Sequence, residues 1–479
     1  MKLLRFQNSL NKELKKTWNL LSLLKSINIS FFEKYMNKER KKVWGWAMYD
    51  WANSAFATTV MAGFFPIFFK QYWTIGTDVN QSTAMLGFGN SIASLLVALM
   101  APVLGAIADR GSLKKKFLIF FAYLGVLMTA GLYMVEKGDW MMAVFVYVMG
   151  VIGFSGANIF YDSLLPSVAD ESNIDSVSSL GFAMGYLGGG LLFLVNVVMT
   201  LQPAIFGLTD AGEAVRWSFV SVAMWWGVFT LITIFWVPEP EMLGEKDQGN
   251  PVLGGFKQLF GTFQEIRHLK TVMLFLLAYW FYIDGVDTII KMAVDYGMSI
   301  GFESNDLIIA LLIVQFVGFP AALIFGSLGE RWGVRSSIFL AIGVYIVVTI
   351  WATMMREKYE FYVLAVVIGL VQGGIQALSR SYYFRLIPKN QAAEYYGFFN
   401  MLGKFAAIIG PALMGVVGLT VRNMLMPDSP SAEQIKAVSQ EASRWSIASI
   451  VILFVIGAVL LFYVDEEKGR AEAEYLFKN

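Results

Sequence analysis

Charged side chains occur inside long apolar stretches of the sequence, where they could bind a solute or a proton. The stretch 271–295 contains four of them, namely Asp284, Asp287, Lys291 and Asp295. At 3.6 residues per turn these four lie along one side of a helix. An ionised side chain costs roughly 2.5–3.5 kcal/mol at the bilayer centre, so they should face a cavity or a partner. We expect Asp284 or Asp287 to act in transport; the alternative is a self-neutralising pair of Asp287 with Lys291.

Two cations lie in later apolar stretches. Arg380 shares a helix face with Gln372 and Gln376, and Lys404 follows Asn400 by about one turn. A guanidinium or ammonium group at such a place can hold a substrate carboxylate, while one of the acids above meets an amine or carries a proton. Structural salt bridges to those acids would explain the same residues. Both interpretations are compatible, because an ion pair that opens when substrate arrives couples binding to movement.

The N-terminal part of the chain has its own polar residues in apolar stretches. Asp50 and Asn53 share one helix face, and Asn158 and Tyr161 lie at the end of a later stretch. We expect these four to line the same cavity. The alternative for Asp50 is a first-turn carboxylate that interacts favourably with the helix dipole. The neighbouring Asp162 reads as a charge at the membrane interface.

Membrane-spanning helices must position these residues. The 479-residue chain is 57% hydrophobic and 15% charged, which leaves too few polar groups for the surface of a soluble protein. The apolar stretches are about 20 residues long, which suffices to cross roughly 30 Å of hydrocarbon. We predict twelve spans, at 44–70, 84–108, 116–135, 140–165, 177–202, 215–237, 271–295, 305–329, 336–355, 360–386, 394–420 and 444–464.

A long polar stretch divides the spans into six and six. The predicted parts are a basic N-terminal extension at 1–43, a six-helix bundle at 44–237, a linker at 238–270, a second six-helix bundle at 271–464 and a tail at 465–479. Most of the 37 Lys and Arg residues fall on the side of the termini, so both termini are expected to be cytoplasmic. The extension reads equally as an amphipathic surface helix or a disordered tail, and Met36 is a second candidate start.

Polar motifs recur at matched places in the two bundles. Glycine, three residues, an acid and Arg follow the second span and again the eighth, and Asp50 in the first span matches Asp284 in the seventh. Such echoes indicate parallel repeats. We expect the repeated loops to form a cytoplasmic gate, because glycine permits close helix approach and ion pairs can break when the bundles separate. The alternative is a topology anchor and a surface pair worth about 0–1 kcal/mol. The gate residues are Gly105, Asp109, Arg110, Gly326, Glu330, Arg331 and Arg335.

These loops resemble the signature loops of the major facilitator superfamily. Three further segments, Tyr49–Phe56, Gln376–Ser381 and Gly403–Pro411, resemble the branch that contains the fungal vacuolar amino-acid effluxers of autophagy and their bacterial relatives. The resemblance extends over residues 40–465. It implies an all-α membrane protein with twelve transmembrane helices in two pseudo-symmetric six-helix bundles that work by alternating access.

We therefore predict a transporter for a small polar solute and not an enzyme. The resemblance and the paired charges favour an amino acid or similar zwitterion, moved by proton coupling or facilitated diffusion. The alternatives are a carrier of a sugar, organic acid, nucleoside or drug, a polytopic membrane enzyme, and a channel or sensor. With no Cys, a single His268 and no phosphate-binding loop, no catalytic residue, metal site or cofactor is expected. The expected partners are the solute, membrane lipid and protons, and no nucleic acid. We expect a monomer, located in a bacterial inner membrane.

Overall fold

A computed structural model describes residues 38–76, 79–111, 113–240, 269–299, 302, 304–388, 391–429 and 431–478. The predicted extension before residue 38 and the linker residues 241–268, which include His268, lie outside the described residues. Among the candidate site residues and their charged neighbours within helices, the side chains of Asp109, Arg110, Lys291, Asp295 and Lys404 also lie outside the description.

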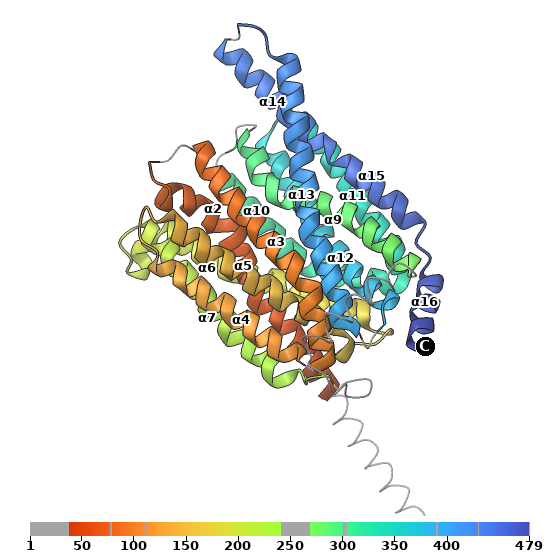
Figure 1. Ribbon diagram of the computed structural model, residues 1–479. Coiled ribbons are helices and arrows are strands. Elements are labelled where there is room, and N and C mark those ends of the chain that lie inside the picture. Colours follow the sequence, from red (N-terminus) through yellow and green to blue (C-terminus); the bar gives the residue numbers. More distant parts are fainter. Residues whose placement is uncertain are drawn as a thin grey trace, which may run out of the picture.

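Long helices make up nearly all of the described chain, and no strand occurs among the described residues (Figure 1). The first span is Lys38–Trp73. The helices that follow are α3 (Val79–Gly111), α4 (Lys114–Gly131), α5 (Trp140–Ser163), α6 (Ile174–Leu201), α7 (Ala211–Trp236), α9 (Lys270–Ser299), α10 (Ser304–Trp332), α11 (Val334–Met354), α12 (Lys358–Leu386), α13 (Ala392–Leu425), α14 (Ala432–Ser449), α15 (Val451–Phe462) and α16 (Glu466–Lys478).

Ten helices within the described ranges are long and apolar enough to cross a membrane, and each corresponds to one predicted span. The other two predicted spans fall on α3 and α13, whose described apolar segments are Ile92–Ala108 and Ile409–Leu425. The last span is continuous in sequence but is divided here into α14 and α15. The all-α fold predicted from the apolar blocks is therefore confirmed.

The first span departs from regular α-helix in its second half. Residues Phe56–Phe64 and Phe69–Trp73 form π-helical turns on either side of the short α2 (Phe65–Phe68). Pro66 lies in this region, and because it has no backbone N–H it interrupts the regular ladder of hydrogen bonds. The π-helical turns begin at Phe56, shortly after the polar residues Asp50 and Asn53 of this span. Such turns are frequent at functional sites.

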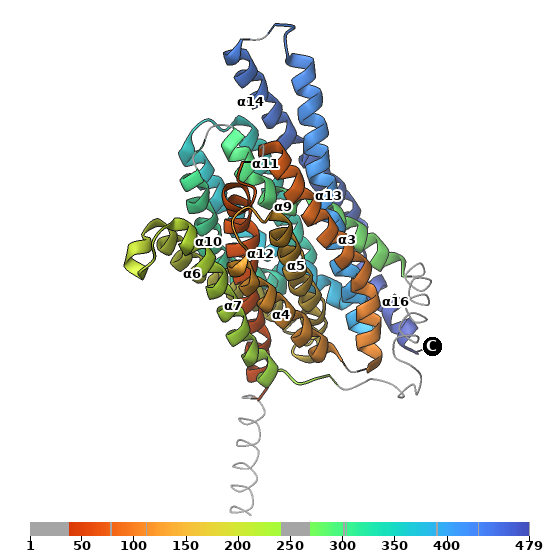
Figure 2. The same cartoon turned by 60° about the vertical axis from the view of Figure 1, so that its left-hand side comes forward.

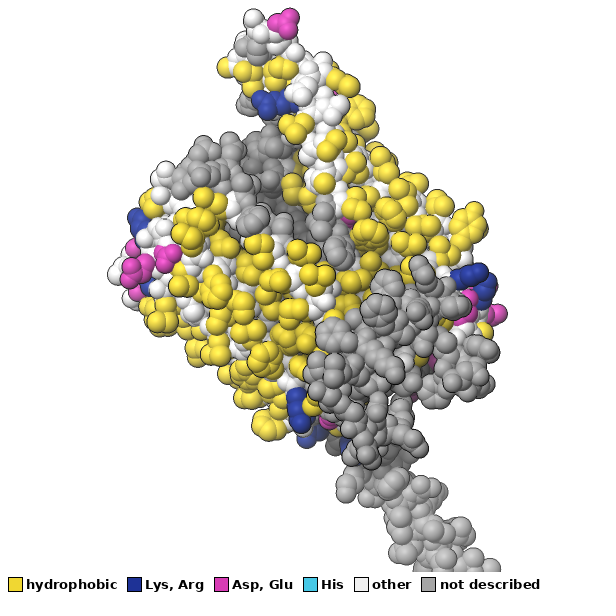
Figure 3. Space-filling model, viewed as in Figure 1, with side chains coloured by type: hydrophobic (Ala, Val, Ile, Leu, Met, Phe, Trp, Pro, Cys, Tyr) yellow, Lys and Arg dark blue, Asp and Glu magenta, His cyan; other side chains and the backbone are white. Residues whose placement is uncertain are grey.

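Residues 38–240 are called here the N half, and residues 269–478 are called the C half. Buried hydrophobic side chains form one cluster in the C half and one that is centred on the N half and also includes Phe384 and Ala393. The halves meet where α3 lies beside α13 and where α6 lies beside α10 (Figures 1 and 2). Hydrophobic side chains cover most of the described side face in Figure 3, as expected for a surface in contact with lipid. The start of the first span and α16 lie at the same end, called here the terminus side, while α13 and α14 project at the opposite end.

Candidate functional site

Arg380 of α12 is buried between the two halves. Its guanidinium Nη1 lies 3.0 Å from Oδ1 of Asp162 and 3.8 Å from Oδ2 of Asp50. Its Nε donates to the hydroxyl of Ser178 at 3.0 Å, and its Nη2 donates to the carbonyl of Ser178 at 2.8 Å. All of these partners belong to the N half, so one C-half side chain ties the halves together.

The carboxyl group of Asp162 holds a second residue of the C half. Its Oδ2 accepts a hydrogen bond from Nδ2 of Asn400 at 3.0 Å, while its Oδ1 binds Arg380. The carboxyl group of Asp50 accepts a hydrogen bond from the hydroxyl of Tyr161 at 2.7 Å. We call Arg380 and its polar partners the inner cluster: Asp50, Tyr161, Asp162, Ser178, Arg380 and Asn400.

Three aromatic rings surround the guanidinium of Arg380. Its Cζ lies 4.8 Å from the ring centroid of Trp46, 5.4 Å from that of Tyr161 and 4.5 Å from that of Phe182. A guanidinium within about 6 Å of an aromatic face is attracted to the negative face of the ring. The positive charge of Arg380 is therefore stabilised by two carboxyl groups and three aromatic rings. Arg380 itself is only 3% exposed.

The inner cluster lies close to the terminus side because of where its residues fall on their helices. Asp162 is next to the last residue of α5, and Arg380 precedes the end of α12 at Leu386 by less than two turns. Ser178 follows the start of α6 at Ile174 by about one turn. Neighbouring helices with opposite directions therefore bring their ends together at one depth.

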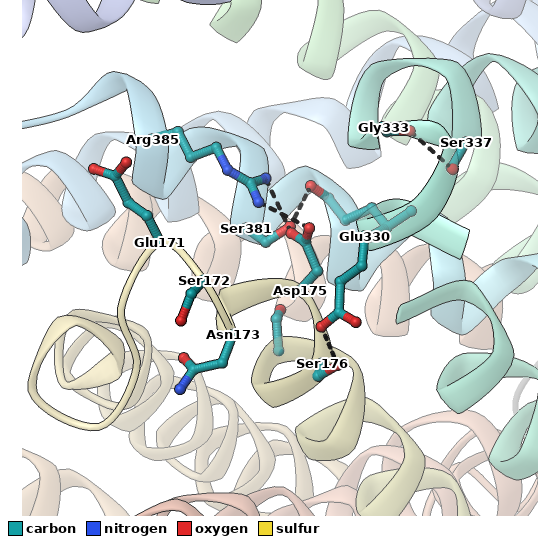
Figure 4. Close-up of polar contacts among 12 residues, drawn as sticks. Glu171, Ser172, Asn173, Asp175, Ser176, Glu330, Gly333, Ser337, Ser381 and Arg385 are labelled. Carbon is teal, nitrogen blue, oxygen red and sulfur yellow. Dashed lines mark hydrogen bonds and ion pairs between the residues drawn. The ribbon is translucent and has the colours of Figure 1, made fainter. Parts of the chain in front are cut away.

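A second set of contacts joins the halves at the helix ends. The guanidinium of Arg385 makes two hydrogen bonds to the carboxylate of Asp175, at 3.0 and 2.8 Å. The hydroxyl of Ser176 donates to the carboxylate of Glu330 at the end of α10. Figure 4 shows Arg385 directed at Asp175 and Glu330 directed at Ser176, so that α12 and α10 each contact the start of α6.

The C-terminal helix α16 adds to these contacts. Arg470 lies 3.1 Å from Glu171 of the N half and 2.6 Å from Glu466, and Glu466 lies 3.8 Å from Arg385. Charges of alternating sign thus run from the loop before α6, through α16, to α12 and back to α6. We call this set the outer cluster: Glu171, Asp175, Ser176, Glu330, Arg385, Glu466 and Arg470.

Glycines let the helices of the two halves approach closely toward the terminus side. A Cβ atom on Gly105 of α3 would lie 2.3 Å from the carbonyl oxygen of Ala393 in α13. A Cβ atom on Gly326 of α10 would lie 2.8 Å from the Cβ of Ser179 in α6. A side chain at either glycine would push the halves apart, so these positions require glycine for the closed terminus side.

A family model described as vacuole effluxer Atg22 like matches residues 38–427. The chain belongs to this Atg22-like family. The chain is similar to YxiO of Bacillus subtilis, named an uncharacterized MFS-type transporter, with 39% identity over 88% of this chain and 94% of YxiO. It is also similar to autophagy-related protein 22 of Yarrowia lipolytica, with 22% identity over 81% of this chain and 76% of that protein.

A comparison of structures shows the fold of this Atg22-like protein. The proton:xylose symporter XylE, of the major facilitator superfamily, has a TM-score of 0.64 and 13% identity, over 92% of this chain and 98% of XylE. The protein therefore has the major facilitator fold. Its relative YxiO is named a transporter, and its apolar helices make it a multi-pass integral membrane protein. The resemblance noted from the sequence is confirmed.

The structure of the Atg22-like chain brings together part of the predicted solute site. Asp50, Tyr161, Arg380 and Asn400 all belong to the inner cluster. Asp50 lies about three turns from Lys38 and is not a first-turn carboxylate, so that alternative is wrong. Nearby, the side chains of Asn53 and Asn158 are joined by a hydrogen bond of 2.6 Å; the wider solute site stays a prediction.

Asp284 of α9 has hydrogen-bond partners other than Arg380. Asp284 is buried and accepts the backbone N–H of Gly410 at 3.0 and 3.1 Å and the hydroxyl of Thr288 at 3.2 Å. Arg380 pairs instead with carboxyl groups of the other half. Of the alternative salt bridges from α9, the one to Arg380 is therefore replaced by an ion pair between the halves. The one to Lys404 lies outside the described side chains. Asp287 is half-buried on α9, and on α12 Gln372 is buried and Gln376 is half-buried.

The predicted gate residues divide into three groups. Gly105, Gly326 and Glu330 lie at contacts between the halves. Arg331 is exposed at the end of α10, and Arg335 contacts Phe462 within the C half. The side chains of Asp109 and Arg110 lie outside the description, as does that of Lys404 in the predicted solute site, so the roles of these three residues stay predictions.

Sequence reasoning missed several residues of both clusters. Asp162 was interpreted as an interfacial charge, but it is 7% exposed and binds Arg380 and Asn400. Its position one residue after Tyr161, inside an apolar span, was the available signal. Asp175 lies in the first turn of α6 and Arg385 in the last turn of α12. Charged residues are common at helix ends, and nothing in the spacing of these two distinguished them.

Proposed function

We propose that this Atg22-like protein is a secondary carrier that moves a small polar solute, an amino acid or similar zwitterion, by alternating access. The observation that carries the proposal is the bond from Arg380 in the C half to Asp162 in the N half. Breaking a buried ion pair without replacement costs about 3–5 kcal/mol. A solute carboxylate that takes the place of Asp162 beside Arg380 would offset this cost, and binding would then be coupled to separation of the halves.

Proton coupling by the buried acids is part of the proposal. Asp50 and Asp162 share Arg380, so adding a proton to either one weakens the bond between the halves. Asp284 is a separate candidate on α9. The Asp50→Asn and Asp284→Asn variants should each show weaker pH dependence of transport if the residue carries the proton. Unchanged pH dependence in a folded variant would remove that residue from the proton pathway.

Orientation, cellular location and oligomeric state complete the proposal. We propose that the terminus side faces the cytoplasm, which the bias of Lys and Arg supports. The proposal further assigns the protein to a bacterial inner membrane, with a monomer as the working unit. The division into bundles at 44–237 and 271–464 belongs to the same proposal. A single cysteine added after Lys478 tests the orientation, because the natural chain has no cysteine. Labelling by an impermeant maleimide in intact cells would contradict a cytoplasmic terminus.

Counterflow in liposomes is the experiment that tests the carrier. Purified protein is reconstituted with an excess of one unlabelled solute inside, and uptake of the labelled solute is followed for amino acids, dipeptides, sugars, nucleosides and organic acids. We expect saturable counterflow with zwitterions and its loss in Arg380→Ala. Counterflow confined to another class would contradict the zwitterion cargo, and saturation without counterflow would contradict a carrier.

A further inference from the structure

The N half contains a site shaped for a flat organic cation. The rings of Trp46, Tyr161 and Phe182 surround the guanidinium of Arg380, and the carboxyl groups of Asp50 and Asp162 lie beside it. Every one of these five side chains belongs to the N half. Only the guanidinium comes from the C half. Arg380 is therefore a tethered cation in a site that the other half has built, and we call these five side chains the cage: Trp46, Asp50, Tyr161, Asp162 and Phe182.

Contacts within the N half hold the cage in shape. Trp46 stacks on Tyr161 with ring centroids 4.4 Å apart and planes inclined by 13°. The indole N–H of Trp46 donates to the carbonyl of Tyr161 at 2.9 Å, and the hydroxyl of Tyr161 donates to Asp50 at 2.7 Å. None of these contacts involves Arg380. The cage should therefore keep its shape when the halves separate and Arg380 withdraws.

Gly181 allows α6 to close this site. A Cβ atom there would lie 2.7 Å from Oδ2 of Asp50, 2.7 Å from the hydroxyl of Tyr161 and 2.9 Å from the ring of Trp46. With glycine at this position, the next residue, Phe182, reaches the guanidinium. The close approach of α6 to the first span continues at Gly185, Gly188 and Gly189, and Gly181 is the part of this contact that closes the cage.

We propose that the cage is a solute site that opens to the terminus side, where the guanidinium group of a solute replaces that of Arg380. This rests on the proposed carrier function, in which the halves separate at the terminus side. The site then binds guanidinium-bearing solutes, such as agmatine or L-arginine, more tightly than ammonium-bearing solutes of equal charge.

The preference for guanidinium follows from the groups that hold Arg380. A guanidinium is flat and weakly hydrated and stacks on aromatic faces, whereas an ammonium is compact and strongly hydrated. The hydroxyl and the carbonyl of Ser178 accept two N–H groups of the fork, and Asp162 accepts a third. An ammonium group has three donors in a different geometry and cannot reproduce this planar set. The solute and Arg380 compete for one place, so solute binding favours the open terminus side.

The first test removes the guanidinium of Arg380 from the cage. Purified Arg380→Ala protein is heated with 5–20 mM guanidinium, methylammonium or sodium chloride at equal ionic strength, about a hundredfold below denaturing concentrations. We expect guanidinium alone to raise the melting temperature of Arg380→Ala and to leave wild type unchanged, because Arg380 fills the wild-type cage. Phe182→Leu in the Arg380→Ala background should abolish the shift, whereas the matched Phe154→Leu, which lies against Phe56 and Trp226, should retain it.

The second test uses the natural Arg380. Ser179 is buried at the contact of α6 with α10, so a Ser179→Cys reporter reacts with a permeant maleimide only when the terminus side opens. We expect agmatine to accelerate labelling at least threefold over putrescine, and L-arginine over L-lysine. Equal labelling rates with guanidinium and ammonium solutes, or no guanidinium-specific shift in monodisperse Arg380→Ala, would overturn the proposal.

The two tests separate this proposal from the carrier function. Neither readout needs transport, so absence of counterflow would contradict the carrier while guanidinium-specific labelling still supported the cage. Counterflow of neutral zwitterions without any guanidinium preference would support the carrier and overturn the cage as a solute site.

Discussion

The two clusters that join the halves differ in how they are enclosed. The inner cluster surrounds one arginine with three rings and two carboxyl groups, and the side chain of Arg380 is 4% exposed. The outer cluster spreads four acids and two arginines over helix ends. Its exposure rises outward, from 2% for the side chain of Asp175 to 49% for that of Glu171. In the inner cluster, protein groups surround the charge in place of water, whereas the outer cluster remains in contact with water on one side.

This difference assigns the clusters different energetic roles. A fully enclosed charge must exchange one partner for another, since the buried partner left behind carries a cost of about 3–5 kcal/mol. Exposed ion pairs can open into water at a cost of about 0–1 kcal/mol. The inner cluster is therefore suited to couple movement to solute binding, and the outer cluster is suited to bias the closed state. Substitutions in each cluster test this assignment.

The largest effect is expected for Arg380→Ala. Removing the guanidinium leaves Asp50 and Asp162 enclosed without their cation, which should lower the free energy of unfolding by about 3–5 kcal/mol. Transport should fall at least 100-fold, as measured by counterflow, because the same group also meets the solute. In the double variant Arg380→Ala/Asp162→Asn, removing a stranded carboxylate should restore part of the thermal stability but none of the transport. Recovery of transport in the double variant would contradict a direct role for Arg380.

A smaller effect is expected for Asp162→Asn. The amide keeps a neutral hydrogen bond with Arg380 but loses the charge-assisted one, which is worth about 1.5–3 kcal/mol, or roughly a 10- to 100-fold change in an equilibrium. The matched variant Asp50→Asn should lose less, because Asp50 lies 3.8 Å from Arg380, whereas Asp162 lies at 3.0 Å. Thermal stability and counterflow of the two variants provide the comparison. Equal losses would mean that distance to Arg380 does not order the two acids.

Arg385→Ala should affect the equilibrium between states more than solute binding. It leaves Asp175 without its bidentate partner, so the closed terminus side should become less populated. The measurement is disulfide formation between Ser176→Cys and Glu330→Cys, whose natural side chains are in contact only across the halves. We expect cross-linking to slow about five- to tenfold, consistent with about 1–1.4 kcal/mol. A loss of solute affinity without slower cross-linking would contradict a role confined to closure.

The sequence predicts features that depend on neighbouring residues better than contacts between residues far apart in the chain. Apolar blocks of membrane length are local, and they placed the spans on the observed helices. Arg380 stood out because a cation in an apolar stretch demands a partner. The identity of that partner is not local: Asp162 lies more than 200 residues away, and the acids of α9 were equally plausible by charge. Aromatic residues such as Phe182 are common in membrane helices. Their spacing in the sequence therefore did not indicate that three of them contact the guanidinium of Arg380.

The smallest effect is expected at the solvent-exposed edge of the outer cluster, for Arg470→Ala. Its two ion pairs, with Glu171 and Glu466, involve side chains that are 31–49% exposed. They should contribute about 0–1 kcal/mol, or at most a fivefold change in the cross-linking rate between Ser176→Cys and Glu330→Cys. The change should disappear as salt is raised from 0.15 to 1 M, where the screening length falls from about 8 to 3 Å. The Arg385→Ala effect should persist at the same salt, because Asp175 is shielded from water. If both effects vanished together at high salt, the outer cluster would act as one exposed network, and the gradient of enclosure would not determine the strength of its pairs.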